Sequence, residues 1–245
     1  MFNKNNLSFI TFCYALSLLL QPVYAQTSCK LGGAYFKSYI TDTKNIAVAP
    51  LHWKPQQYIA AALITGGIIA LTQYDESISS WVQQNKTDAT GEITKFLKPL
   101  GNDLVVLGGS AGIYALGALT HQEKTSCIGL QNFKAVLISS AFIFGIKHLT
   151  HRARPYMYLG SKEWEMWSND WEYTSFPSGH STFAFTTATT FTSISNKKIV
   201  PIIAYTLAAS VALSRIHDNR HWPSDVLAGA AIGTAFSLTI NRSFK

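Results

Sequence analysis

The sequence predicts an all-α protein built around a six-helix core bundle. Charged residues make up 13% and hydrophobic residues 47% of the 245 residues, a balance that allows a large buried core or a membrane-embedded body. No stretch alternates apolar and polar residues between hairpin turns, as strands would. Instead, six apolar segments of helical length follow one another: Tyr58–Thr72, Leu104–Thr120, Ala135–Ile146, Ser181–Ser195, Ile199–Leu213 and Val226–Ile240.

The segments between these six helices also carry local signals. In Ser77–Lys98, apolar residues recur at roughly helical spacing, which predicts short amphipathic helices before the second long one. The stretch Arg152–Phe176 contains Pro155, Gly160 and several aromatic residues, and we expect a loop there.

The composition excludes several classes of protein and of partner. A disordered chain would need high charge and few apolar residues, and a chain with three cysteines is not a cysteine-stapled miniprotein. The net charge of +7 is small and unclustered, so we expect no nucleic-acid surface. This charge suits a phosphorylated or anionic-lipid partner.

The amino terminus has the features of an export signal. Lys4 supplies a positive charge, Leu7–Leu20 is almost wholly apolar, and compact residues precede a possible cut after Ala25. These features predict a cleavable signal peptide over residues 1–25, with an uncleaved anchor as the alternative. Residues 26–245 contain no repeat or low-complexity linker, so we expect them to form a single domain.

Cleavage would remove Cys13 and leave Cys29 and Cys127. An oxidising compartment permits a disulfide between them, and two free thiols are the alternative. There is no pair of cysteines with CxxC spacing, so neither a zinc site nor a thioredoxin-like site is indicated.

The six segments suit either membrane spans or buried core helices. A span needs about 20 mostly apolar residues, and only Pro55–Tyr74 supplies such a stretch without a charge. If the signal is cleaved and all six segments span, Lys147 lies in the cytoplasm. The positive charges at Lys197, Lys198 and Arg242 favour the opposite orientation, so the number of spans stays open.

Three motifs lie at the ends of the apolar segments. The first runs from Lys147 to Arg154-Pro155, and the second is the tetrapeptide Pro177-Ser178-Gly179-His180. The third joins Ser214-Arg215 to His221 and Asp225. Antiparallel helices joined in this order bring all three motifs to the same end of the bundle.

The motifs resemble those of the type 2 phosphatidic acid phosphatase (PAP2) and vanadium haloperoxidase superfamily, whose pattern is K-x6-RP, PSGH and SR-x5-H-x3-D. The resemblance implies the six-helix core of that superfamily, here with short extra helices before it. It also implies that His221 is the nucleophile that forms a phosphohistidine, and that His180 protonates the leaving oxygen and then activates water. This scheme needs no metal or other cofactor, and vanadate is expected to inhibit.

The residue types also suit phosphate chemistry on physical grounds. Phosphoryl transfer depends mainly on positioning and on stabilising negative charge, and Lys147, Arg154 and Arg215 supply three cations. The Ser178 hydroxyl and the Gly179 amide, at a helix start, add donors. Asp225 lies one helical turn after His221, where a carboxylate would fix the ring tautomer and stabilise its charge.

The sequence therefore predicts an exported phosphatase that acts on a phosphomonoester or pyrophosphate, carried by a lipid. Its site is expected outside the cytoplasm and its body in contact with a membrane. The aromatic loop with Trp164, Trp167 and Trp171 suits an interface that holds an acyl or prenyl chain, or alternatively a lid over the site. Other candidate functions are a soluble periplasmic acid phosphatase of broad range, a vanadium haloperoxidase, and a phospholipid binder or transporter without catalysis.

Overall fold

The computed structural model describes residues 29–165 and 170–242. Over these residues the secondary structure is helical, with one isolated bridge between Arg152 and Trp164 and no strand. The predicted all-α fold is confirmed, and each of the six apolar segments is a helix. The predicted signal peptide, residues 1–25, lies outside the described residues.

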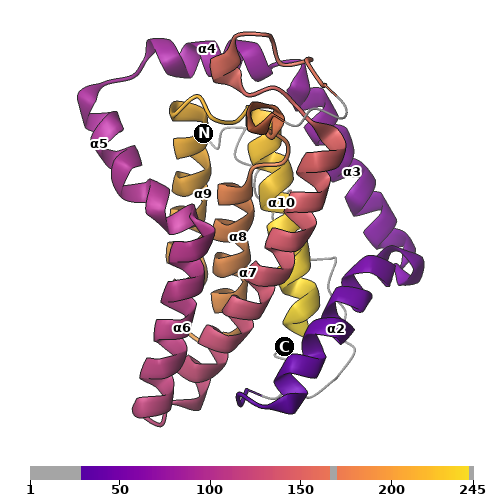
Figure 1. Ribbon diagram of the computed structural model, residues 1–245, viewed down its shortest axis with the longest axis vertical. Helices are drawn as coiled ribbons and strands as arrows, with labels where there is room; N and C mark the ends of the chain where they lie inside the picture. Colours follow the sequence, from indigo (N-terminus) through magenta and orange to yellow (C-terminus); the bar gives the residue numbers. More distant parts are fainter. Residues whose placement is uncertain (1–28, 166–169, 243–245) are drawn as a thin grey trace, which may run out of the picture.

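Six long helices form the core of the molecule. They are α3 (Pro55–Thr72), α6 (Asp103–Leu119), α7 (Glu123–Thr150), α8 (Gly179–Ile194), α9 (Ile199–His217) and α10 (Pro223–Ile240). Figure 1 shows α6 to α10 side by side, with α8 in contact with α7, α9 and α10, and with α3 leaning on α10. The carboxyl ends of α7 and α9 and the amino ends of α8 and α10 consequently meet at one end of the bundle, which we call the site end.

Two shorter helices, α4 (Asp75–Gln84) and α5 (Asp88–Leu97), and the 3-10 turn η2 (Lys98–Gly101) confirm the helices expected before the second long segment. Helix α4 lies across the site end, in contact with α9 and α10 (Figure 1). The predicted loop after α7 contains two 3-10 turns, η3 (Pro155–Met157) and η4 (Trp171–Tyr173). Helix α4 and this loop together cover the site end.

The structure contains additional helical turns that hydropathy did not predict, because these turns include polar residues. Helix α2 (Gly33–Val48), followed by η1 (Ala49–His52), packs on α7 and α10 near the opposite end. The third segment, expected over Ala135–Ile146, is part of the 28-residue helix α7. Lys134 in its added turns is fully buried, and its Nζ lies 2.6 Å from Oδ2 of Asp42 in α2. Each added region thus satisfies the polar groups of the other.

Helix α10 approaches α8 very closely through two glycines. A Cβ added at Gly229 would lie 2.4 Å from the carbonyl oxygen of Ser178, and one at Gly233 would lie 2.2 Å from that of Thr182. Between the same helices the hydroxyls of Thr190 and Ser237 are 2.9 Å apart. The absence of glycine side chains therefore sets the distance between the start of α8 and α10.

Large apolar side chains are exposed along the outside of the bundle. Helices α7, α9 and α10 are each long and apolar enough to cross a membrane, and the bent pair formed by residues 88–101 and α6 is a further candidate. The exposed side chains on α3, α6 and α9 include Ile59, Leu63, Ile69, Leu104, Leu116, Leu119, Ile202, Ile203 and Leu213. An apolar surface of this extent suits contact with a membrane rather than with water.

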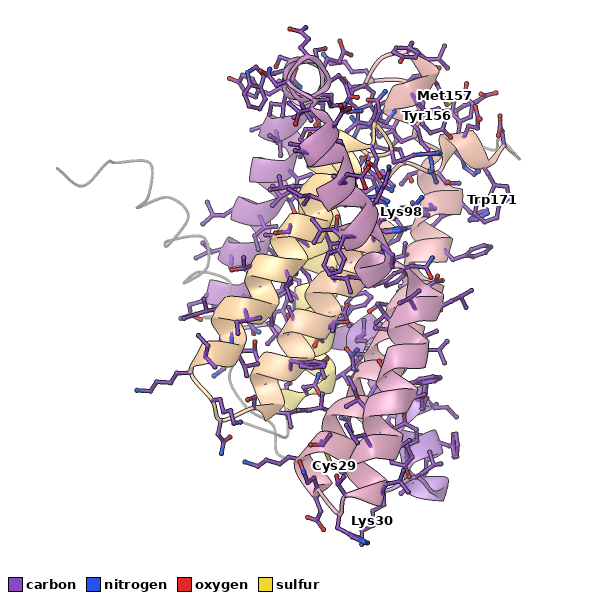
Figure 2. All side chains as sticks on the ribbon, turned by 90° about the vertical axis from the view of Figure 1, so that its left-hand side faces the viewer. Cys29, Lys30, Lys98, Tyr156, Met157 and Trp171 are labelled. Carbon is purple, nitrogen blue, oxygen red and sulfur yellow. A yellow bond between two sulfur atoms is a disulfide. The ribbon has the colours of Figure 1, made fainter. Side chains whose placement is uncertain are left out.

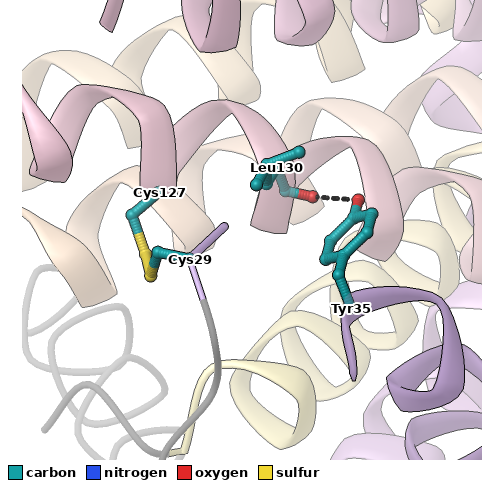
Figure 3. Close-up of a disulfide and its surroundings, with 4 residues drawn as sticks. All are labelled: Cys29, Tyr35, Cys127 and Leu130. Atoms are coloured by element: carbon teal, nitrogen blue, oxygen red, sulfur yellow. Dashed lines mark hydrogen bonds between the residues drawn. A yellow bond between two sulfur atoms is a disulfide. The ribbon is translucent and has the colours of Figure 1, made fainter. Parts of the chain in front are cut away.

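Cys29 and Cys127 form a disulfide that spans 98 positions of the sequence (Figure 3). It ties the chain before α2 to the first turns of α7, and close by the hydroxyl of Tyr35 donates to the carbonyl oxygen of Leu130 at 2.8 Å. Figure 2 shows Cys29 at the end of the bundle opposite Tyr156 and Trp171. Of the two states considered for these cysteines, the structure has the bonded one, and it lies far from the site end.

Candidate active site

The three motifs meet at the site end, as the order of the helices predicted. Each motif lies where a helix ends or begins, so that the backbone of a rigid element holds its side chains. The predicted site residues are Lys147 in the last turn of α7, Arg154 just beyond it, Ser178, Gly179 and His180 at the start of α8, Arg215 in the last turn of α9, His221 between α9 and α10, and Asp225 in the first turn of α10.

Two of the three cations share one partner in the loop. The Nζ of Lys147 donates to the carbonyl oxygen of Thr174, and Nη2 of Arg154 donates to the Thr174 hydroxyl at 2.9 Å. Arg215 instead pairs with Asp218, which directly follows its helix α9. Within the described residues, the buried Nε atoms of Arg154 and Arg215 have no hydrogen-bond partner. Buried donors of this kind are available to an anion.

The His221 ring is held in one tautomer by the backbone. Its Nδ1 lies 2.8 Å from the carbonyl oxygen of Ser175. A carbonyl only accepts, so Nδ1 carries the proton and Nε2 keeps a free lone pair. The ring is 5% exposed. Burial, followed by the charges of Lys147, Arg154 and His180, lowers the pKa of His221 well below its usual value. The ring is therefore neutral, the form in which a histidine is nucleophilic.

Asp225 does not make the hydrogen bond expected from its spacing. Its Oδ2 lies 4.0 Å from Nδ1 of His221, which is beyond hydrogen-bond distance, and the Ser175 carbonyl occupies that role. The fully buried carboxylate instead accepts from the Ser175 hydroxyl at 2.6 Å, the Trp222 amide at 2.9 Å and Nη1 of Arg152 at 2.6 Å. Asp225 thus holds Ser175, which in turn holds the histidine, and its charge remains near the ring.

The start of α8 carries the second motif. Ser178 caps the helix, since its hydroxyl oxygen accepts from the Ser181 amide at 3.4 Å, and its own amide donates to the Asp225 carbonyl at 3.0 Å. A Cβ added at Gly179 would lie 3.5 Å from the Phe183 ring of the same helix and 4.0 Å from Ile143 in α7, which are ordinary contact distances. The packing of the protein therefore leaves room for a side chain there, and any need for glycine would come from a bound ligand.

His180 faces the same group of cations. Its Nε2 is buried and, in the part of the chain that the structure describes, has no hydrogen-bond partner. Burial lowers the pKa of His180 to about 4, helped by the charges of Arg215, Lys98, Lys147 and Arg154. A bound anion would offset those charges and restore the proton. The electrostatics of the site therefore favour the binding of a negatively charged group.

Sequence reasoning missed several residues of this site. Ser175 and Thr174 lie two and three residues before the second motif, so their nearness to it was the only available signal. Lys98 reaches the site because η2 packs on α8, where a Cβ added at Gly101 would lie 3.0 Å from Cβ of His180. Asp75, at the start of α4, is fully buried beside Arg152 and Ser224, and no local pattern indicated it.

Comparison with known proteins agrees with the motifs. The PAP2 superfamily model matches residues 130–245, which contain all three motifs. The lipid A 1-phosphatase of Rhizobium etli is 28% identical over 204 residues, which cover 77% of this chain and 84% of that protein. The lipid A 1-phosphatase of Porphyromonas gingivalis is 48% identical over 61 residues, but these cover only 24% of this chain and 14% of that protein.

Two solved structures share the fold at low sequence identity. The LpxE of Aquifex aeolicus has a TM-score of 0.54 at 20% identity, with 68% of this chain and 93% of that one covered. A transmembrane PAP2-type phosphatidylglycerolphosphate phosphatase from Bacillus subtilis has a TM-score of 0.51 at 20% identity, with 84% and 92% covered. The motif-bearing region of the chain, residues 130–245, matches the PAP2 superfamily model, and the fold shared with these two structures agrees with that match.

Proposed function

We propose that the protein is a phosphatase that hydrolyses a phosphomonoester or pyrophosphate carried by a lipid, through a phosphohistidine intermediate. The observation that carries this proposal is the combination of a buried, neutral His221, whose Nε2 is unprotonated, with buried Nε donors of Arg154 and Arg215 that have no hydrogen-bond partner among the described residues. Relatives named lipid A 1-phosphatases support a lipid phosphate as the substrate class.

In the first step, Lys147, Arg154 and Arg215 bind the phosphate oxygens and offset the charge that spreads over them in the transition state. The Nε2 lone pair of His221 attacks phosphorus, and the bond from phosphorus to the leaving oxygen breaks. His180 gives its proton to that oxygen. The ring of His221 becomes positively charged, and the Ser175 carbonyl and the nearby Asp225 carboxylate stabilise it.

In the second step, the neutral His180 takes a proton from water, whose oxygen attacks phosphorus. The bond between phosphorus and Nε2 of His221 breaks, and inorganic phosphate leaves. His180 is then protonated and His221 is neutral, as both were at the start of the first step. We propose that no metal or other cofactor takes part in either step.

The exposed apolar and aromatic side chains support a lipid substrate. Trp171 is 63% and Tyr158 is 87% exposed in the loop at the site end, where amphipathic rings suit the membrane interface. Trp164 has a different surrounding, since its ring lies 5.1 Å from the Arg152 guanidinium. Trp167 lies outside the described residues. We infer that Trp164 acts as part of a lid, whereas Trp171 is free to meet lipid.

A panel of substrates tests the proposal, with phosphate release measured from lipid phosphomonoesters, lipid pyrophosphates and soluble esters in detergent micelles. We expect faster phosphate release from the lipids than from the soluble esters, inhibition by vanadate, and loss of turnover in His221→Ala with the fold retained. His121→Asn, at the far end, is the control and should keep full activity. Unchanged turnover in His221→Ala would refute the mechanism. Equal rates on soluble esters would refute the lipid preference, and bromide oxidation in place of phosphate release would indicate a haloperoxidase.

We also propose that the protein is exported and that its site lies outside the cytoplasm. Disulfides persist in oxidising compartments, so the bond between Cys29 and Cys127 supports export of the end that carries it. The site lies at the other end. A bundle that threads the membrane would separate the two ends, whereas a bundle held on the exported side would keep them together.

Labelling of single cysteines in spheroplasts tests this arrangement. Lys162→Cys reports on the site end and Lys197→Cys on the opposite end, because both lysines are exposed. Each is made in a background in which Cys13, Cys29 and Cys127 are replaced by serine. We expect a membrane-impermeant maleimide to label Lys162→Cys without lysis. Labelling at Lys197→Cys alone would place the site inside and refute the proposal.

A further inference from the structure

Arg152, which the first motif's pattern leaves unassigned, lies at the centre of a buried ion-pair network. Its side chain is 1% exposed. Nη1 donates to Oδ1 of Asp225 at 2.6 Å, and Nη2 donates to Oδ2 of Asp75 at 2.7 Å. Nε and Nη2 also donate to the Ser161 carbonyl at 3.0 and 2.6 Å. One guanidinium therefore joins two fully buried carboxylates that lie 150 positions apart in the sequence.

Two aromatic rings fix the plane of this guanidinium. Its central carbon lies 5.1 Å from the Trp164 ring and 5.7 Å from the Trp222 ring, distances at which a cation is attracted to an aromatic face. The Trp222 indole is itself held, because its Nε1 donates to the Ala153 carbonyl at 2.9 Å. Arg152 consequently presents its donors in one fixed direction.

Asp75 ties helix α4 to the start of α10. Its Oδ1 accepts from the Ser224 amide at 2.9 Å, and its Oδ2 accepts from the Ser224 hydroxyl at 2.5 Å. Ser224 directly precedes Asp225, so the same carboxylate holds the backbone next to Asp225 and the cation that contacts it. Asp75 lies outside residues 130–245, which the PAP2 model matches, and the three motifs do not contain it.

The network reaches the nucleophile through Ser175. The Ser175 amide donates to the Arg152 carbonyl at 2.9 Å, and its hydroxyl donates to Asp225 at 2.6 Å. These two bonds orient the Ser175 carbonyl that accepts from His221. The network also carries a net negative charge, since two carboxylates face one guanidinium. That charge acts against the influence of Lys147, Arg154 and His180, which disfavour a protonated His221.

We propose that Asp75 and Arg152 are positioning residues for the reaction: their buried ion pair holds Asp225 and Ser175, and through them keeps the His221 ring aimed at phosphorus. The proposal rests on the proposed function, because it assigns a role within that chemistry. It adds to the family motifs a residue from a helix that lies outside the matched region.

Asp75→Asn tests the proposal while keeping the shape of the side chain. We expect kcat to fall by about ten- to a hundredfold, the range that a misdirected reactive group costs, with KM nearly unchanged because the phosphate-binding cations are intact. Removal of a negative charge also disfavours a protonated His221, so the acid limb of kcat/KM should move to lower pH.

Asp42→Asn is the matched control, because Asp42 pairs near the opposite end with Lys134, a cation that is buried like Arg152. It should lower thermal stability but leave kcat and the pH profile unchanged. Ser224→Ala, which removes one hydroxyl from the network, provides a second variant if Asp75→Asn fails to fold, and it should lower kcat with KM nearly unchanged.

The outcomes separate this proposal from the proposed function. If the parent enzyme is active and the folded variants Asp75→Asn and Ser224→Ala keep its kcat and pH profile, the positioning role alone is overturned. The same loss of activity in Asp42→Asn would overturn it as well, because the effect would then be one of stability. A parent that releases no phosphate would overturn the proposed function itself.

Discussion

The close approach of α10 to α8 at Gly229 predicts a substitution that weakens both the fold and the site. In Gly229→Ala the new Cβ would lie 2.4 Å from the Ser178 carbonyl oxygen, whereas ordinary contact begins at 3.4 Å. The helices must therefore separate by about 1 Å. Overpacking of this kind costs about 1–3 kcal/mol, and the better helix propensity of alanine returns about 1 kcal/mol. Because the obstacle is backbone, we take the upper value and expect a net loss of about 2 kcal/mol.

The same displacement should reach the chemistry. Ser178 caps α8, and its amide donates to the Asp225 carbonyl at 3.0 Å, so a shift of α10 also moves the donors at the start of α8. A misplacement of 1 Å costs activity about a hundredfold. We therefore expect kcat/KM for a lipid phosphate to fall by about that factor in Gly229→Ala.

Urea unfolding in detergent micelles and phosphate release measure the two effects. Gly66→Ala in α3 is the matched control, because a Cβ there would meet nothing within 4 Å. It should gain up to about 1 kcal/mol and keep its activity. The reasoning fails if Gly229→Ala is as stable as the parent, or if Gly66→Ala is destabilised to the same degree.

Two further predictions concern the disulfide and the pH dependence. Replacement of Cys29 and Cys127 by serine should cost up to about 4–5 kcal/mol, the entropy of closing a loop of that length, with unchanged turnover per folded molecule; a loss below about 1 kcal/mol in denaturant titration would contradict this. The basic limb of kcat/KM should reflect the free His180, whose pKa is about 4. The limb of kcat should lie at higher pH because bound phosphate offsets the cations, and coincident limbs would count against the proposed general acid.

Much of the fold could be predicted from local patterns. The six apolar segments are long enough to be recognised as helices, and their antiparallel order alone brings the three motifs to one end. Helix α2 and the first turns of α7 escaped prediction because their polar residues are buried against one another. The free-energy cost of burying the charged Lys134 is offset only when Asp42 lies beside it. The two residues are too far apart in the sequence for a local pattern to include both.

The same distinction applies to the site. The sequence alone predicted Lys147, Arg154, His180, Arg215, His221 and Asp225 as site residues, because phosphate chemistry constrains residue type and spacing along each helix end. Only the tertiary structure decided that the Ser175 carbonyl, and not Asp225, accepts the hydrogen bond from Nδ1 of His221. It alone brought Asp75 to Arg152 and Lys98 towards His180. Hydrogen bonds depend on tenths of an ångström between elements far apart in the chain, and those distances are set by how the helices pack.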